Sequence, residues 1–123
     1  MLTHWLEVQD YCISKLALEA VELVMVFCLD RQNPLIADKT ISRGTVNQTS
    51  VYPREVVDLV LRHFSQAVIV IHNHPGVEMR PSHADIDVTR DISAALAVME
   101  ITLHDHFIVA GTECVSLKSL GHL

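Results

Sequence analysis

Residues 67–85 read AVIVIHNHPGVEMRPSHAD, and they join a short apolar run to a cluster of metal-ligating residue types. The first five residues are continuously apolar, which is typical of a buried strand. Side chains in a strand alternate between its two faces, so residues two apart emerge on the same side, about 7 Å apart from Cα to Cα. His72 and His74 can therefore converge on one ion, while Asn73 points the other way.

The same segment ends in the pattern of a helix start. Pro75 and Pro81 bracket a loop, and Ser82 followed three residues later by Asp85 is typical of a helix N-cap. Taken alone, a His-x-His pair often occurs by chance and Ser-x-x-Asp is more often a plain cap. Together, at this spacing, they favour a metal site in which the loop folds back and presents Asp85 as the third ligand. Two histidines and a carboxylate leave one position of a tetrahedral zinc ion for water, as in catalytic zinc sites.

Composition restricts the remaining possibilities. The chain has 123 residues, half of them hydrophobic, which is enough for one domain over residues 1–123 that buries about two thirds of its unfolded surface. The net charge is −6 and the nine Lys and Arg are scattered, so charge does not support a nucleic-acid partner. The cysteines are odd in number and far apart in apolar settings, which predicts reduced core residues; they are Cys12, Cys28 and Cys114.

The sequence also carries signals about location. Glu7 and Asp10 fall where a signal peptide needs an apolar stretch, and no apolar run approaches the roughly 18 residues that span a bilayer. We therefore expect a cytoplasmic protein with no membrane partner. A homo-oligomer is compatible with these observations.

Periodicity predicts alternating helices and strands. The expected elements are a helix at 3–20, a strand at 23–29 covered on both faces, its hairpin partner at 35–41, a second helix from Pro53, the strand at 67–71, a third helix from Ser82, and a hairpin of 101–110 with 114–117. The predicted buried side of the second helix comprises Val56, Val57, Val60, Leu61 and Phe64. These elements predict an α/β fold, of the α+β type, with a mixed sheet flanked by helices.

The motif as a whole resembles a known signature. His-x-His, seven residues and then Ser-x-x-Asp are similar to the signature of the JAMM (MPN+, JAB) zinc metalloprotease superfamily. The segments 41–47 and 53–56 and the pair Asp105-His106 resemble its RadC-like branch, and the likeness covers about residues 20–118. It implies an MPN/JAB-like mixed β-sheet flanked by helices, with cytidine-deaminase-like layering.

The resemblance also implies roles for individual residues. It makes Zn²⁺ the cofactor, held by His72, His74 and Asp85, and it makes Glu22 the general base. A carboxylate at the start of the apolar strand at 23–29 would lie at the edge of the core, although Glu22 could instead be the solvated end of the preceding helix.

Three further polar residues have two interpretations each. The resemblance gives the Ser82 hydroxyl the task of steadying the developing oxyanion, and a plain N-cap is the alternative. Asp105 or His106 would be either a partner that orients a metal ligand or a hydrogen-bonded residue of a strand.

These observations favour a zinc-dependent metallopeptidase or isopeptidase, with a peptide or an isopeptide-linked protein as substrate. The alternatives are an MPN-fold binding or scaffold module and a DNA-repair-associated protein without hydrolytic activity. The resemblance is weakest at residues 76–79, where Gly-Val-Glu-Met replaces the Ser-Gly that usually follows His-Pro in RadC-like chains.

Overall fold

The computed structural model describes most of the chain, namely residues 7, 10, 11, 13, 14, 22–30, 35–43, 51–74 and 80–123. All five described residues between 7 and 14 are helical, where the sequence predicts a helix over 3–20. The rest of that predicted helix, Cys12 and the loop at 76–79 lie outside the described residues.

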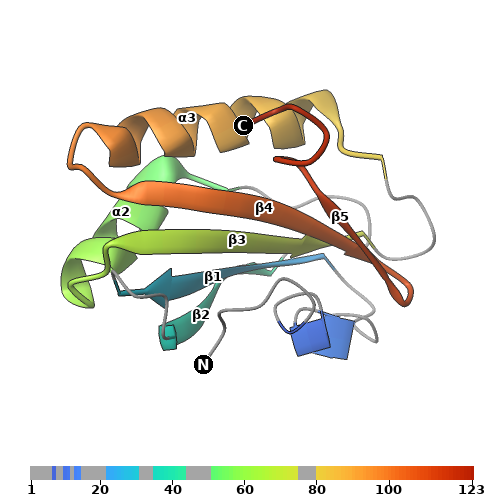
Figure 1. The fold of residues 1–123 in the computed structure, drawn as a ribbon, viewed down its shortest axis with the longest axis horizontal. Coiled ribbons are helices and arrows are strands. Elements are labelled where there is room, and N and C mark those ends of the chain that lie inside the picture. Colours follow the sequence, from blue (N-terminus) through green and yellow to red (C-terminus); the bar gives the residue numbers. More distant parts are fainter. Residues whose placement is uncertain are drawn as a thin grey trace.

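A five-stranded mixed sheet organises the fold (Figure 1). The strands are β1 (Leu23–Leu29), β2 (Leu35–Arg43), β3 (Ala67–Asn73), β4 (Thr102–Ala110) and β5 (Glu113–Ser116). Their order is β2-β1-β3-β4-β5, and only the β3–β4 pair is parallel among the described strands. With the helices α2 (Pro53–Arg62) and α3 (His83–Ala97), the sheet confirms the predicted α/β class and is consistent with the JAB/MPN fold.

The two central strands are buried on both faces. Every residue of β1 and β3 is buried, and their side chains alternate between two apolar clusters. One cluster contains Val24 and Val70 and receives side chains from α2 and α3, so both helices cover this face. The other contains Phe27 and Ile71, and Tyr11 packs against it. Because both faces are covered, the strand at 23–29 is continuously apolar, as predicted.

The end of α2 corrects one prediction. Val56 and Val60 are buried as expected, but the side of the helix that they define does not extend to Leu61 or Phe64, which are 56% and 87% exposed. Leu61 follows Val60 directly and therefore lies about 100° further round the helix. Phe64 lies beyond the last helical residue, at a positive φ of 52°, so helical periodicity does not apply to it.

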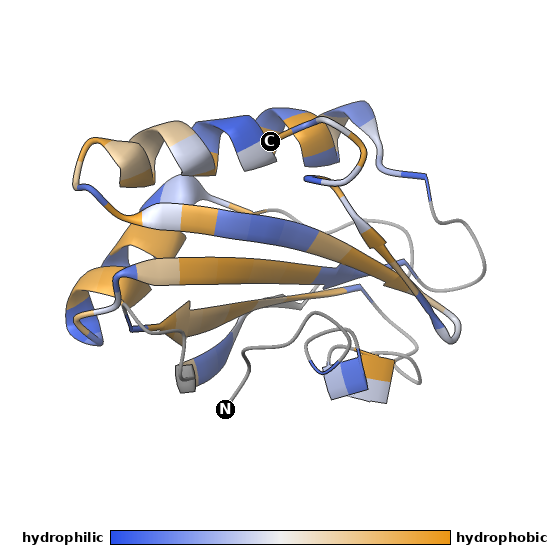
Figure 2. Ribbon diagram, in the orientation of Figure 1, coloured by the Kyte–Doolittle hydropathy of each residue, from blue (hydrophilic) through white to orange (hydrophobic). Residues whose placement is uncertain are grey.

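Strand β4 carries a hydrophilic stretch into the sheet (Figure 2). Asp105 and His106 are both buried there. The register with β3 changes at this point, since Val68 pairs with Leu103 and Ile69 with Asp105, passing over His104. The predicted hairpin to β5 is confirmed and turns at Gly111, which has a φ of 60°. No helix within the described ranges is long and apolar enough to cross a membrane.

Candidate metal centre

The antiparallel pairing of β1 and β3 places Glu22 beside His72. Val24 pairs with His72, so the start of β1 lies against the end of β3. Oε1 of Glu22 is 3.0 Å from Nε2 of His72, and both side chains are at least nine-tenths buried. Glu22 is therefore buried at the edge of the core and is not on a solvated helix end.

His74 and Asp85 complete a compact group with these two residues. The rings of His72 and His74 are 4.8 Å apart between centroids and nearly perpendicular. Oδ1 of Asp85 is 3.2 Å from Nδ1 of His72, and its Oδ2 is 3.3 Å from Nε2 of His74. The structure thus brings together both histidines and both carboxylates that the sequence singled out.

Asp85 is held in place by the cap of α3. The Ser82 amide donates to Oδ2 of Asp85 at 2.8 Å, and the Asp85 amide donates to Oγ of Ser82 at 3.0 Å. Burial raises the pKa of Asp85, but its bonds from His72, His74 and the Ser82 amide outweigh burial and hold this pKa well below its ordinary value. Asp85 is consequently an ionised acceptor for cations, and Ser82 has the capping role that the Ser-x-x-Asp pattern predicts.

The donor set fits a zinc ion. Ligating atoms of Glu22, His72 and His74 all lie within 4.8 Å of one another, and Asp85 faces both histidines at 3.2 and 3.3 Å. The two imidazoles are therefore shared by two candidate triads, each completed by a different carboxylate. Two imidazoles with one carboxylate are typical of catalytic zinc. His72 faces a carboxylate at each ring nitrogen, so one nitrogen can ligate an ion while the other keeps its carboxylate partner.

Asn73 makes a contact between strands that the sequence does not reveal. Its side chain points away from the histidines, as strand alternation predicts, and its Oδ1 accepts a hydrogen bond of 2.5 Å from the Leu23 amide. Because Leu23 follows Glu22 directly, this bond ties the end of β3 to the backbone that carries Glu22. The signal was present in the sequence as an amide between two histidines, but its partner is fifty residues away.

Beneath the site, Thr89 and His106 form a second polar layer. The Thr89 hydroxyl lies 2.5 Å from the backbone carbonyl of Asp85 and 2.5 Å from Nδ1 of His106. Burial lowers the pKa of His106 to about 3, with a smaller contribution from the nearby His72. Nε2 of His106 is buried and has no hydrogen-bond partner among the described residues. His106 lies 6.0 Å from His72 between ring centroids.

The carboxylate of Asp105 bonds to neighbouring strands and not to the candidate metal residues. Its carboxylate accepts hydrogen bonds from the amides of His106 and Lys118 and from the hydroxyl of Ser116. These bonds join β4 to β5 and to the segment that follows. Of the two predicted orienting residues, His106 is therefore the one that lies beside the candidate ligands.

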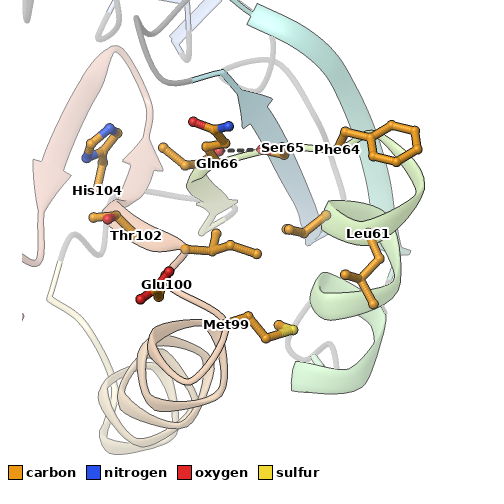
Figure 3. Close-up of a pocket in the computed structure, with 11 residues that line it drawn as sticks. Leu61, Phe64, Ser65, Gln66, Met99, Glu100, Thr102 and His104 are labelled. Atoms are coloured by element: carbon orange, nitrogen blue, oxygen red, sulfur yellow. Dashed lines mark hydrogen bonds between the residues drawn. The ribbon is translucent and has the colours of Figure 1, made fainter.

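A cleft of about 630 Å³ lies at the other end of the sheet. His104 and Phe64 lie on opposite sides of it, and Leu61 and Met99 also line it (Figure 3). None of the four candidate metal residues is in its lining. His104 is thus separate from the histidine group at 72 and 74, despite forming a His-x-His pattern with His106.

The mixed sheet and the His-His-carboxylate group define a domain of the JAB/MPN class, which relates the chain to the JAMM superfamily. The model of the RadC-like JAB domain matches residues 2–122, and the chain belongs to this family. It is 41% identical over all 123 residues to a UPF0758 protein from Ruegeria pomeroyi. The match covers 55% of that relative, so the chain spans about half the length of the curated relative that it matches.

Proposed function

We propose that this protein is a zinc-dependent metallopeptidase or isopeptidase that hydrolyses an amide bond in a peptide or an isopeptide-linked protein. The observation that carries the proposal is the buried convergence of two imidazoles and two carboxylates at the end of β3. A metal-binding function requires only three of these four groups. The fourth is then available as a base beside the metal, which is what hydrolysis needs.

His72, His74 and Asp85 would hold the zinc ion. When bound, zinc supplies Lewis-acid activation of water and polarisation of the scissile carbonyl. Asp85 suits the ligand role because Ser82 and α3 fix its carboxylate between the two rings. Both its oxygens face imidazoles, which leaves it poorly placed to exchange protons with a substrate.

Glu22 would act as general base. It takes a proton from the attacking water and returns it to the leaving amine, so the carboxylate is regenerated at the end of the cycle. Its burial beside His72 supports this role, and it lacks the helix cap that constrains Asp85. Ser82 is exposed at the N-terminus of α3, and we propose that its hydroxyl also steadies the developing oxyanion. Loss of one such donor typically lowers the rate about 100- to 1000-fold.

The test combines metal analysis with hydrolysis of a panel of peptides and isopeptide conjugates. We expect about one zinc ion per chain. Asp85→Asn should lose zinc and activity together, whereas Glu22→Gln should keep zinc and lose activity. Asp91→Asn, on the exposed side of the same helix as Asp85, is the matched control and should keep both.

Other outcomes reject specific parts of the proposal. Absence of zinc from protein purified without chelators would reject the metal site. Loss of zinc in Glu22→Gln, with retention in Asp85→Asn, would make Glu22 the ligand and exchange the two roles. Zinc binding without hydrolysis of any panel substrate would reject the enzyme and leave a metal-binding module.

A further inference from the structure

The hydrogen bonds of Thr89 fix which nitrogen of His106 carries the hydrogen. A backbone carbonyl has no hydrogen to give, so in the contact with Asp85 the Thr89 hydroxyl must be the donor. That hydroxyl has only one hydrogen and can therefore only accept from His106. The hydrogen of the neutral ring consequently lies on Nδ1, which donates to Oγ1 of Thr89.

This chain of bonds ends at the residue that faces both histidines. Thr89 holds the carbonyl of Asp85, while the Ser82 cap holds its carboxylate and its amide. Asp85 is thus fixed from the helix entrance and from one turn further along α3. The cap acts on the exposed end of the helix, whereas Thr89 is completely buried.

The backbone of β4 keeps the ring of His106 in place. Asp105 accepts from the His106 amide, and the Leu117 amide donates to the His106 carbonyl at 3.0 Å. The ring is buried, and its Nδ1 lies against Thr89 of α3. His106 is therefore a fixed donor on the sheet. The Thr89 hydroxyl links it to α3, the helix that carries Asp85.

We infer that Thr89 and His106 are positioning residues of the metal centre, which set the place of the Asp85 carboxylate between His72 and His74. This inference rests on the proposed metal site and goes beyond it, since neither residue touches the ion. Residues that orient metal ligands typically contribute about 10- to 100-fold to metal affinity.

The zinc dissociation constant, measured by competition with a chelating dye, tests this inference without reference to activity. Thr89→Val keeps the shape of the side chain but removes the hydroxyl, and we expect zinc to bind roughly 10- to 100-fold more weakly. Thr89→Ser retains the hydroxyl and should restore affinity to within a few-fold of the unchanged protein. A purely structural role would lower the melting temperature of the metal-free Thr89→Val protein and leave the dissociation constant unchanged.

His106 offers a second pair of variants. His106→Leu removes the donor to Thr89 and should weaken zinc binding, whereas His106→Asn can present an amide N–H in its place and should bind more tightly than His106→Leu. Nitrogen NMR of the unchanged protein should show a hydrogen on Nδ1 and none on Nε2. The opposite tautomer would overturn the inference.

Failure of this inference is separable from failure of the proposed function. If the unchanged protein binds zinc and Thr89→Val binds it equally well, the positioning role is wrong and the metal site stands. If the unchanged protein binds zinc but hydrolyses nothing, the enzyme is rejected while the positioning role is still measured. If it binds no zinc, both are overturned.

Discussion

The two ends of β3 differ in what they bury and what they expose. At the end near the start of α3, His72, Asn73 and Asp85 are buried polar groups with close polar partners. At the other end, Phe64 is an apolar side chain that is 87% exposed beside the cleft. Both arrangements oppose the general preference for apolar interiors and polar surfaces. They differ in energetic terms, because the buried polar groups are interdependent while the exposed ring contacts little.

The comparison predicts large, coupled effects at the first end and small, local effects at the second. A buried group that loses its partner bears its full desolvation cost, whereas an exposed group can be solvated by water instead. Substitutions at the two ends therefore test the comparison directly.

The largest expected effect is the loss of unfolding free energy in acid that His106 causes. Burial lowers its pKa from the ordinary value of 6.5 to about 3 in the folded protein, so between these values the unfolded chain binds a proton that the folded protein does not. The resulting stability is fully present above about pH 6.5 and is lost as the pH falls toward 3; it amounts to on the order of 4–5 kcal/mol. His106→Asn should flatten the pH dependence of the unfolding free energy across this window. Equal slopes in both proteins would contradict the burial of a neutral ring.

The next largest effect on stability is expected from removing the His72 ring, which lies between the carboxylates of Glu22 and Asp85. His72→Ala removes the ring that Glu22 and Asp85 both contact while the two carboxylates stay buried, and we expect a loss of about 3–5 kcal/mol in metal-free protein. Denaturant unfolding near neutral pH in the presence of a chelator measures this. A loss below about 1 kcal/mol would show that water reaches the site readily and that the two ends are less different than the burial indicates.

A smaller effect, of opposite sign, is expected at Phe64. An L-residue at positive φ is strained by roughly 1 kcal/mol, and this exposed ring gains little from burial in return. Phe64→Gly should therefore raise the unfolding free energy by about 0.5–1 kcal/mol. Phe64→Ala is the matched control, since it removes the ring but keeps the Cβ that causes the strain. A stabilisation by alanine as large as that by glycine would reject the backbone explanation.

The smallest effect belongs to the exposed ion pair of α2. Nε of Arg62 lies 2.9 Å from Oδ2 of Asp58, and both side chains are more than half exposed. Asp58→Ala should change stability by less than about 0.5 kcal/mol, in contrast to the buried pair at His72. Thermal unfolding at low and high salt checks this. A change above about 1 kcal/mol would remove the distinction between buried and exposed pairs in this protein.

Local sequence was sufficient to predict the helices and strands and part of the candidate site. Alternation along β3 explains why His72 and His74 converge, and the cap signal locates Asp85, because these are properties of neighbouring residues. The predicted buried side was wrong for Leu61, which lies on another side of α2, and for Phe64, which lies beyond the end of the helix.

The long-range contacts could not be predicted in this way. Glu22 was assigned by resemblance, because its contact with His72 depends on strand pairing fifty residues apart. The partners of Asn73 and Thr89 depend likewise on which strands and helices become neighbours. Physical reasoning on one sequence can identify donors and acceptors, but the fold decides which of them meet.

The change of register at His104 has a further consequence for β4. Because successive side chains of a strand face opposite ways, one extra residue reverses the facing of everything after it. If every residue of β4 took part in the ladder, Val70 would be level with Asp105, and the carboxylate would lie under α3. The register passes over His104, so Val70 is level with His106 instead. Loss of the bulge, with His104 taken into the ladder, would therefore exchange a neutral ring for an anion beneath Asp85. The bulge at His104 therefore decides that a neutral ring, and not an anion, lies in the floor of the candidate metal centre.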